Sequence, residues 1–382
     1  MMIIHDSDLK GDATHQHTWS HSDDFLSALI GLQLQRFIAE FGRGVLWQKA
    51  EKEIGMPTDI EQDSMVVVEG IGCFSWENQI FGYLCEESTR NYHRVVSDGP
   101  IDSFVNAVNA FIREASPFRG HLVQLAHGGS RYISNCLAPQ FLSLPEMNMD
   151  DVVLDQTVKD DVFENTIVQL ELNQNTGVLL YGPPGTGKTR TCKVLASEAI
   201  KRGYSALMIA GGVDFNDLGE LIEGFMPRPL ILFFEDLDTF AEDRMSGRES
   251  HLSQFLQFMD GMATRQNQIV VVGTTNHRDF LDDAIKKRPG RFSRHYEIGF
   301  PPQKSLRTMI EDRFGPQVIP DELVQACLKY PFTGAHIEEI YRTSLTKAHR
   351  KQCEPADCFV EALETVAQHF DCESQSLGLG HG

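Results

Sequence analysis

Cationic side chains are scarce in this sequence of 382 residues. It has 34 Lys and Arg against 54 Asp and Glu, which gives a formal net charge of −20 at pH 7. A protein that coats DNA or binds an anionic membrane surface needs a cationic face to attract the phosphates. The charge balance therefore argues against both classes, and nucleic acid is not expected as a partner.

Long apolar runs are also missing. The most apolar stretch, residues 25–41, is interrupted by Arg36, Glu40 and several Gln and Ser residues. It is shorter than the about 20 apolar residues that cross a bilayer. The first residues, MMIIHDSDLK, show no basic segment followed by an apolar one, so no secretory signal is expected. We predict a protein without a membrane span.

The cysteines show no metal-binding or disulfide pattern. There are eight, scattered along the chain, with no CxxC pair and no spacing typical of a zinc site. Reduced thiols in a cytoplasmic protein are expected. The eight positions are Cys73, Cys85, Cys136, Cys192, Cys327, Cys353, Cys358 and Cys372.

The first part of the chain predicts an α+β domain. Residues 1–22 are polar and are expected to form a flexible tail. Residues 23–54 have apolar positions near helical spacing and predict one or two helices. The segments MVVVEGI, IFGYLCE and HRVVS have the composition of strands, and residues 101–115 that of a helix with one apolar face.

A hairpin is predicted next, from HLVQLA and RYISNCLA on either side of the turn at 127–130. A linker is expected near residues 143–150. The predicted N-terminal domain therefore covers residues 23–145, and we expect it to bind the substrate or partner of the protein.

The second part of the chain alternates short apolar runs with helical stretches. The runs are GVLLYG, YSALMIA, PLILFFED, IVVVGTTN and HYEIGF, a pattern typical of a parallel sheet covered by helices. From residue 303 only helices are predicted. We expect an α/β nucleotide-binding subdomain over 146–301, a helical lid over 302–370 and a flexible tail over 371–382.

The sequence GPPGTGKT at residues 182–189 predicts a phosphate-binding loop. It fits the pattern G-x-x-x-x-G-K-[ST], and it follows a predicted strand and opens a predicted helix. Its glycines allow backbone N–H groups to surround a phosphate, and the helix adds the positive end of its dipole. Lys188 is expected to reach the terminal phosphates, and the Thr189 hydroxyl to bind Mg²⁺.

Two carboxylates follow the second predicted strand after this loop. LILFFEDLD at 230–238 is an apolar strand that ends in Glu235 and Asp236, at the strand edge where α/β sheets bind ligands. Phosphoryl transfer needs one group to hold Mg²⁺ and another to orient or activate water. These two acids meet that need.

Asn276 and a group of arginines complete the candidate site. Asn276 ends the strand IVVVGTTN, so its amide can orient the attacking water or contact the γ-phosphate. Arg288, Arg291 and Arg294 belong to RPGRFSR, and an arginine directed at a phosphate of a neighbouring subunit would stabilise the transition state.

Taken together, these segments resemble the AAA module of the AAA+ ATPases, in the central AAA clade. The resemblance rests on GPPGTGKT, FFEDLD, FLQFMDGM, GTTN, RPGRFSR and TGAHIEEIYR in this order, and it covers about residues 150–370. It implies a P-loop NTPase fold with ATP and Mg²⁺ as cofactors and ATP hydrolysis as the reaction. It also implies a homo-oligomeric ring, expected to be a hexamer, with ATP held at the subunit interfaces.

The resemblance implies roles for individual residues. Arg291 and Arg294 would act on ATP in the next subunit, and residues 151–154 would pass close to the adenine. The catalytic set is Lys188, Glu235, Asp236, Asn276, Arg291 and Arg294, and the metal ligands are Thr189 and Glu235. The nucleotide-binding set is Gly182, Pro183, Pro184, Gly185, Thr186, Gly187, Lys188, Thr189, Arg190, Gly334 and Ala335.

This sequence departs from the family pattern at two places. The family usually has Asp-Glu where this chain has Glu235-Asp236, an order similar to that of the mitochondrial Rieske-protein translocase branch. By position, Glu235 takes the Mg²⁺ role and Asp236 activates water. In addition, the chain passes from Phe215 almost directly into the helix ELIEGF, so the substrate loop of threading members is shortened.

Three functions are compatible with the sequence. The first is an ATP-hydrolysing ring that remodels or translocates a protein partner, by rigid-body motion of its subunits. The second is a nucleic-acid motor or loader on the same fold, which would need more basic side chains than Lys286, Lys287 and the finger arginines. The third is a nucleotide-gated scaffold with weak turnover, which the Glu-Asp order leaves open. We favour the first.

Overall fold

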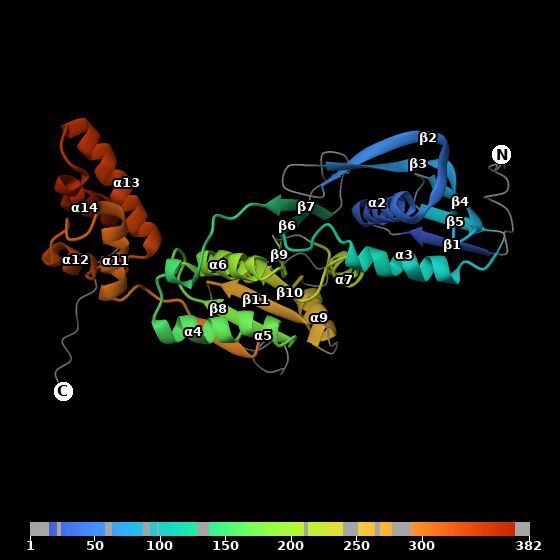
Figure 1. The fold of residues 1–382 in the computed structure, drawn as a ribbon. Coiled ribbons are helices and arrows are strands. Elements are labelled where there is room, and N and C mark those ends of the chain that lie inside the picture. Colours follow the sequence, from blue (N-terminus) through green and yellow to red (C-terminus); the bar gives the residue numbers. More distant parts are fainter. Residues whose placement is uncertain are drawn as a thin grey trace.

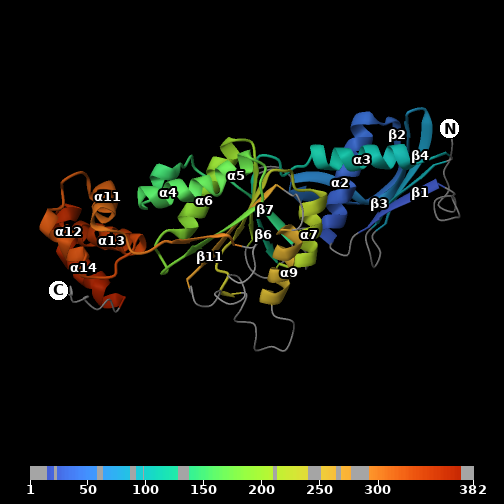
Figure 2. The ribbon, with the colours of Figure 1, turned by 90° about the horizontal axis from the view of Figure 1, so that it is seen from below.

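Three units follow one another along the molecule in the computed structural model (Figure 1). An N-terminal sheet with two helices lies at one end, a helical unit at the other, and a seven-stranded sheet flanked by helices lies between them. The view turned by 90° shows the same order (Figure 2). The structure describes residues 15–20, 24–57, 63–86, 92–97, 99–127, 137–209, 213–239, 251–263, 268–276 and 292–370. Within these ranges, no helix has the length and apolar character needed to cross a bilayer.

The N-terminal unit is an antiparallel five-stranded sheet in the order β1-β5-β4-β3-β2, packed against two helices. The predicted strands near residues 65–71, 80–86 and 93–97, and the helix near 101–115, are confirmed. The elements are β1 (His15–Ser20), α2 (Asp24–Phe41), β2 (Arg43–Pro57), β3 (Asp63–Trp76), β4 (Gln79–Glu86), β5 (Tyr92–Ser97) and α3 (Asp102–Glu114).

Two predictions for this unit are wrong. Residues 15–20 were expected in a flexible tail, but they form β1, which pairs with β5 over its whole length. Residues 43–54 were expected to be helical, but they belong to β2, which pairs with β3. Gly44, at φ +61°, turns the chain after α2, and pairing with β3 then overrides the local helical spacing.

The predicted boundary at residue 145 is also wrong in one respect. The hairpin is confirmed, with β6 (Leu122–His127) antiparallel to β7 (Leu137–Leu142), but its second strand starts later than predicted. The hairpin extends the central sheet, because β6 pairs in parallel with β9. Its apolar residues Leu122 and Val123 are buried there, so the hairpin belongs to the nucleotide-binding unit.

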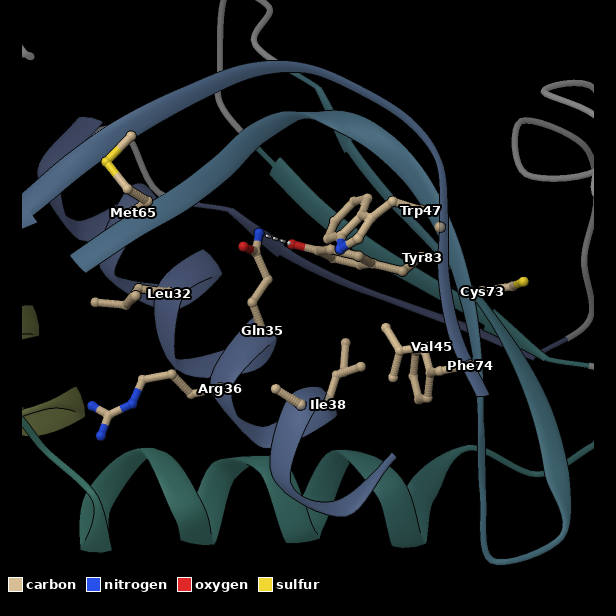
Figure 3. A pocket seen from close by; sticks show the side chains of 12 residues that line it. Leu32, Gln35, Arg36, Ile38, Val45, Trp47, Met65, Cys73, Phe74 and Tyr83 are labelled. Atoms are coloured by element: carbon tan, nitrogen blue, oxygen red, sulfur yellow. Dashed lines mark hydrogen bonds between the residues drawn. The ribbon is translucent and has the colours of Figure 1, made fainter. Parts of the chain in front are cut away.

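A partly buried chain of hydrogen bonds joins α2 to the N-terminal sheet, and Figure 3 shows its bond between Gln35 and Tyr83. Gln35 Nε2 donates to the Val67 carbonyl oxygen (2.7 Å) and to Tyr83 Oη (3.0 Å), and Gln35 Oε1 accepts from the Val67 N–H (3.0 Å). Tyr83 Oη lies 2.8 Å from His93 Nδ1. β4 pairs with β3 only from Gly70 onward, so Gln35 satisfies both backbone groups of Val67 beyond that pairing.

His93 packs tightly beneath α2. A Cβ at Gly31 would lie 2.3 Å from His93 Cε1, so only glycine allows the helix to come this close to the ring. Burial lowers the pKa of His93 to about 4, and a hydrogen bond to the Ser27 backbone opposes the shift only in part. The imidazole is therefore neutral in the folded protein at neutral pH.

The central unit is a seven-stranded sheet in the order β12-β8-β11-β10-β9-β6-β7. All neighbouring strands are parallel except β6 and β7, so the predicted α/β fold is confirmed. The other elements of this unit are η1 (Met149–Asp151), α4 (Gln156–Glu164), α5 (Ile167–Glu171), β8 (Thr176–Tyr181), α6 (Lys188–Lys201), β9 (Ser205–Ile209), α7 (Phe215–Gly224), β10 (Leu230–Phe234), α9 (His251–Ala263), β11 (Ile269–Thr275) and β12 (Arg294–Glu297).

Side chains of the central strands alternate between two cores. Val178, Leu180, Ile231 and Phe233 pack with α4, α5 and α6 on one face. Neighbouring positions such as Leu232 face α7 and α9 in a second core. This second core continues without a break into the core of the N-terminal unit, so the two units share one buried apolar cluster.

The C-terminal unit contains only helices, as predicted, and has its own apolar core. Its elements are α11 (Gln303–Phe314), α12 (Asp321–Cys327), α13 (Gly334–Lys351), the short 3₁₀ helix η4 (Pro355–Cys358) and α14 (Phe359–His369). α13 is the longest of them, and it begins beside the phosphate-binding loop of the central unit.

Acid is expected to destabilise the N-terminal unit through His93. An unfolded histidine titrates near 6.5, so between pH 6.5 and 4 the unfolded chain binds a proton that the folded chain does not. The free energy of unfolding should fall by about 1.4 kcal/mol per pH unit in this window, about 3 kcal/mol in all. All three tryptophans, Trp19, Trp47 and Trp76, lie in this unit, so tryptophan fluorescence in urea titrations reports its unfolding.

The matched control is His93→Gln, which removes the titrating ring. Its unfolding free energy at neutral pH should be lower, because the contact with Tyr83 is altered, but its dependence on pH between 6.5 and 4 should be flatter. An equal pH dependence in the two proteins would show that His93 does not cause the effect.

Candidate nucleotide-binding site

The loop that follows β8 requires glycine at its first position. Gly182 has φ +147°, and a Cβ there would lie 2.2 Å from the Ile298 carbonyl oxygen, which follows the neighbouring strand β12. Gly185 has φ +77°, and its Cβ would lie 2.7 Å from Thr333 Oγ1 of the helical lid. Gly187, at φ +107°, is the N-cap of α6. The glycines thus shape the loop and allow the lid to touch it.

Lys188 is the central cation of the site. Its Nζ donates to the carbonyl oxygens of Gly182 (2.7 Å) and Pro183 (2.9 Å) and to Asn276 Oδ1 (2.8 Å). Burial lowers the pKa of Lys188, and the charges of Asp236 and Asp238 oppose this shift. The ammonium group therefore joins the loop after β8 to the end of β11, within the electrostatic reach of the acids after β10.

Glu235 has a buried side-chain oxygen and lies near Cys192 of α6. Its Oε1 is buried and has no hydrogen-bond partner in the described part of the chain. Burial raises the pKa of Cys192 well above its usual value, and the nearby charge of Glu235 raises it further. Thr189 lies one turn before Cys192 on the same side of α6. A carboxylate oxygen and a hydroxyl are donors that Mg²⁺ prefers, so these residues fit that ion.

Asp236 occupies a left-handed backbone conformation, with φ +50°. Its N–H donates to Thr274 Oγ1 (3.0 Å), and its side chain is exposed at the carboxyl edge of β10. Asp and Asn tolerate this conformation better than most residues. The chain turns at Asp236 but stays beside β11, because the Leu237 N–H donates to the Thr274 carbonyl oxygen (2.8 Å).

Asp238 is a site residue that the prediction omitted. Its Oδ1 accepts hydrogen bonds from Thr275 Oγ1 (3.0 Å) and from the Asn276 N–H (3.4 Å). Asn276 in turn accepts from Lys188, so Asp238 fixes the end of β11 against the lysine. The signal was present in the sequence, because FFEDLD has a third acid two residues after Asp236.

A cavity of about 300 Å³ lies between the loop and the lid. Arg190 Nε donates to the Asp151 carbonyl oxygen (2.9 Å), which holds the segment before α4 at the wall of the cavity. Nine lining residues lie in segments that the sequence pointed to: Asp151, Val152, Val153, Gly185, Thr186, Gly187, Arg190, Gly334 and Ala335. The prediction did not name five lid residues, Met309, Asp312, Arg313, Ile337 and Glu338. The first three belong to α11, which has no recognisable motif, whereas Ile337 and Glu338 follow Gly334 and Ala335 within TGAHIEEIYR.

Of the two arginines predicted to act on ATP in the next subunit, Arg291 and Arg294, only Arg294 lies among the described residues. Arg294 is the first residue of β12, and its exposed Nε donates to Asn165 Oδ1 (3.2 Å) at the end of α4. It pairs in register with Val178, near the start of β8, whereas the loop follows the end of that strand. Arg294 does not line the cavity of its own chain. Arg291 lies outside the described residues.

These features define a P-loop nucleotide-binding fold, with a phosphate loop between a parallel strand and a helix and acids at the ends of adjacent strands. Residues 178–300 match the family described as "ATPase family associated with various cellular activities (AAA)". The match and the loop geometry together identify an AAA ATPase domain over these residues, as the resemblance to the AAA+ ATPases predicted. The placement in the central AAA clade stays a prediction.

Curated relatives agree with this assignment. The chain is 33% identical to Tat-binding homolog 7 of Caenorhabditis elegans over 179 residues, 43% of this chain and 13% of that protein. It is 29% identical to ATPase family AAA domain-containing protein 2B of Homo sapiens over 225 residues, 53% of this chain and 15% of that protein. It is 28% identical to peroxisomal ATPase PEX6 of Saccharomyces cerevisiae over 266 residues, which are 63% of this chain and 25% of that protein. The chain thus spans a quarter or less of each relative.

Asp238 is expected to matter for turnover more than for nucleotide affinity. Asp238→Ala removes the acceptor that holds Thr275 and Asn276, and kcat for ATP should fall by about 10–100-fold, as for other residues that orient a reacting group. Asp238→Asn keeps a carbonyl oxygen at the same place and should retain most of the turnover. Steady-state ATPase assays and nucleotide titrations measure the two effects. Equal loss in both variants would mean that the charge, not the hydrogen bonds, is required.

Proposed function

We propose that this protein is a ring-forming ATPase that remodels or moves a protein partner. The observation that supports this most is the division of the site. The carboxyl ends of the central strands bring together Lys188, Glu235, Asp236 and Asn276. Arg294 instead lies at the amino end of β12, where Asn165 holds it. A site arranged in this way is completed by a second copy of the chain, which supplies its arginine.

In the proposed reaction, water attacks the γ-phosphate in line with the leaving oxygen. Asp236 accepts the proton of this water, and Asn276 orients it. Lys188 exchanges the carbonyl oxygens of Gly182 and Pro183 for phosphate oxygens and neutralises their charge. When bound, Mg²⁺ would spread the developing charge of the phosphates, held by Thr189 and Glu235.

The Glu-Asp order changes the reach of the base. Asp236 is one methylene shorter than the glutamate usual in the family, so the water must approach closer to the strand end. The left-handed turn at Asp236 and its bond to Thr274 Oγ1 fix the backbone there. We infer that this turn, rather than a longer side chain, positions the carboxylate for catalysis.

Mixed rings test whether the arginine acts between subunits. Arg294→Ala keeps its own pocket but lacks the arginine, and Asp236→Asn keeps the arginine but lacks the base. Each protein alone should have little ATPase activity while it still binds ATP. Mixed in equal amounts, about one quarter of the interfaces would pair an intact pocket with an intact arginine, so activity should reappear.

Asparagine suits this experiment because it tolerates the φ of +50° at position 236. A rate per subunit that rises with protein concentration would support assembly. No recovery in the mixture, together with a rate independent of concentration, would contradict an arginine acting between subunits.

The N-terminal unit is the proposed binding site for the partner. It contains a cavity of about 290 Å³ between α2 and the curved strands β2 and β3 (Figure 3). Val45, Trp47 and Met65 line it and are exposed. Gln35 and Tyr83 bond to one another within the wall, and the charged Arg36 lies at its exposed side, so most of the cavity suits apolar side chains of a protein partner.

Two further features support the proposal that the partner is moved by rigid-body motion of the subunits. The core of the N-terminal unit is continuous with the α7–α9 face of the central sheet, so a rotation of the ATPase domain carries the N-terminal unit with it. α7 starts at Phe215 and is capped directly by Asp214, which leaves little chain for a substrate-threading loop after β9. We place this activity in the cytoplasm, a reducing compartment that suits the free thiols of the described cysteines.

The role of this cavity in partner binding can be tested with a variant that traps the partner. Asp236→Asn protein loaded with ATP should retain the partner, and adding Trp47→Ser with Met65→Ser should weaken this retention several-fold, because apolar contact area is lost. Ile80→Ser is the matched control: Ile80 is also exposed but lies on the other face of the sheet from the buried Phe81. Equal losses in both proteins would argue against the cavity.

A further inference from the structure

Two cysteine side chains meet at the turn between α13 and α14. Cys353 Sγ lies 3.6 Å from Cys358 Sγ, which is van der Waals contact between two sulfur atoms. Cys353 is exposed, whereas Cys358 is 1% exposed. Among the cysteines that the structure describes, no other two have their sulfur atoms in contact. The sequence spacing C-x₄-C gave no indication of this pair.

The turn holds the two thiols in this arrangement. α13 ends at Gln352, which is in a left-handed conformation with φ +56°, and the Cys353 N–H donates to the Ala348 carbonyl oxygen (3.2 Å). The chain then turns through Pro355 into η4, and Cys358 is the N-cap of α14. The turn therefore brings an exposed and a buried sulfur atom together, and rotation of the exposed Cys353 side chain would bring them to bonding distance.

We propose that Cys353 and Cys358 form a reversible dithiol–disulfide site whose oxidant is a small-molecule disulfide of the glutathione class. The thiolate of Cys353 attacks one sulfur of glutathione disulfide, whose S–S bond breaks and releases one glutathione thiolate. The thiolate of Cys358 then attacks Cys353 Sγ and displaces the second glutathione. The two protons pass to the departing thiolates. The protein loses two electrons, and the oxidant gains them.

Exposure sets the order of the two steps. Cys353 is accessible to a solvent-borne disulfide, and Cys358 reaches only the sulfur of Cys353. The hydrogen bond shared with Cys358 raises the pKa of the Cys353 thiol, the charge of Asp357 raises it further, and the Lys351 ammonium lowers it. The first step should therefore quicken as the pH rises through the alkaline range.

The bond would tie together two helices of the lid. Lys347 and Lys351 of α13 already form ion pairs with Glu361 of α14, next to this turn. The other end of α13, at Gly334, lines the nucleotide cavity. Oxidation therefore restrains the helix that contacts the nucleotide at its opposite end, and reduction releases it.

The test uses Cys372→Ser protein as the background, because no Lys or Arg separates Cys372 from the pair and a tryptic peptide would contain all three. This protein is incubated with glutathione disulfide at mildly alkaline pH, and the peptide from Gln352 is analysed by mass spectrometry. We expect a loss of two hydrogen atoms, reversed by dithiothreitol. With Cys358→Ser added, the reaction should stop with one glutathionyl group on Cys353, and with Cys353→Ser added, neither product should form.

A second measurement separates a specific bond from general oxidation. Amide hydrogen exchange in residues 348–362 should slow in the oxidised background protein and remain unchanged in Cys358→Ser treated in the same way. The proposal is overturned if Cys353 accumulates as a stable glutathione adduct while Cys358 is present. It is also overturned if neither residue reacts while the unfolded protein does.

Discussion

One ammonium group connects the parts of the site that act on the nucleotide. Lys188 Nζ bonds two carbonyl oxygens of its own loop and Asn276 Oδ1 at the end of β11. Asn276 is held by Asp238, and the Asp236 backbone by Thr274, so the ends of β8, β10 and β11 are tied to one point. These strand ends meet because the parallel register places them at the same edge of the sheet. The site is therefore a consequence of sheet topology, made specific by a few polar contacts.

Glu235 carries the buried oxygen that a bound ion would satisfy. A buried carboxylate oxygen with no partner in the described residues costs stability, and such groups persist where a ligand or ion compensates for them. The lid contributes to the same region, because Gly185 and Thr333 are in close contact. Binding at this cavity thus engages the lid as well as the strand ends. The core shared by the N-terminal unit and α7–α9 connects this region to the cavity where we propose that a partner binds.

The sequence predicted the ATPase part of the fold far better than the N-terminal part. Strands β8 to β11 are buried apolar runs, and three of them lead directly into motifs. All four were predicted, as was the more exposed β12. The assignment of residues 43–54 failed because pairing with β3 decides that segment, and the β6–β7 hairpin was placed in the wrong unit because neither turn nor composition says which sheet it joins. Asp238 was missed because its role depends on Thr275, which is remote in sequence. The contact between Cys353 and Cys358 depends on the turn between two helices.

The most direct test of the central claim is a calorimetric titration of the protein with Mg²⁺ and a slowly hydrolysed ATP analogue, compared with Lys188→Met. The account predicts one site per chain in the parent protein and an affinity at least about 100-fold weaker in the variant, because a buried charge-assisted contact with the phosphates is lost. Equal affinities in the two proteins, with the variant folded, would contradict the assignment of Lys188 and its loop as the phosphate-binding element.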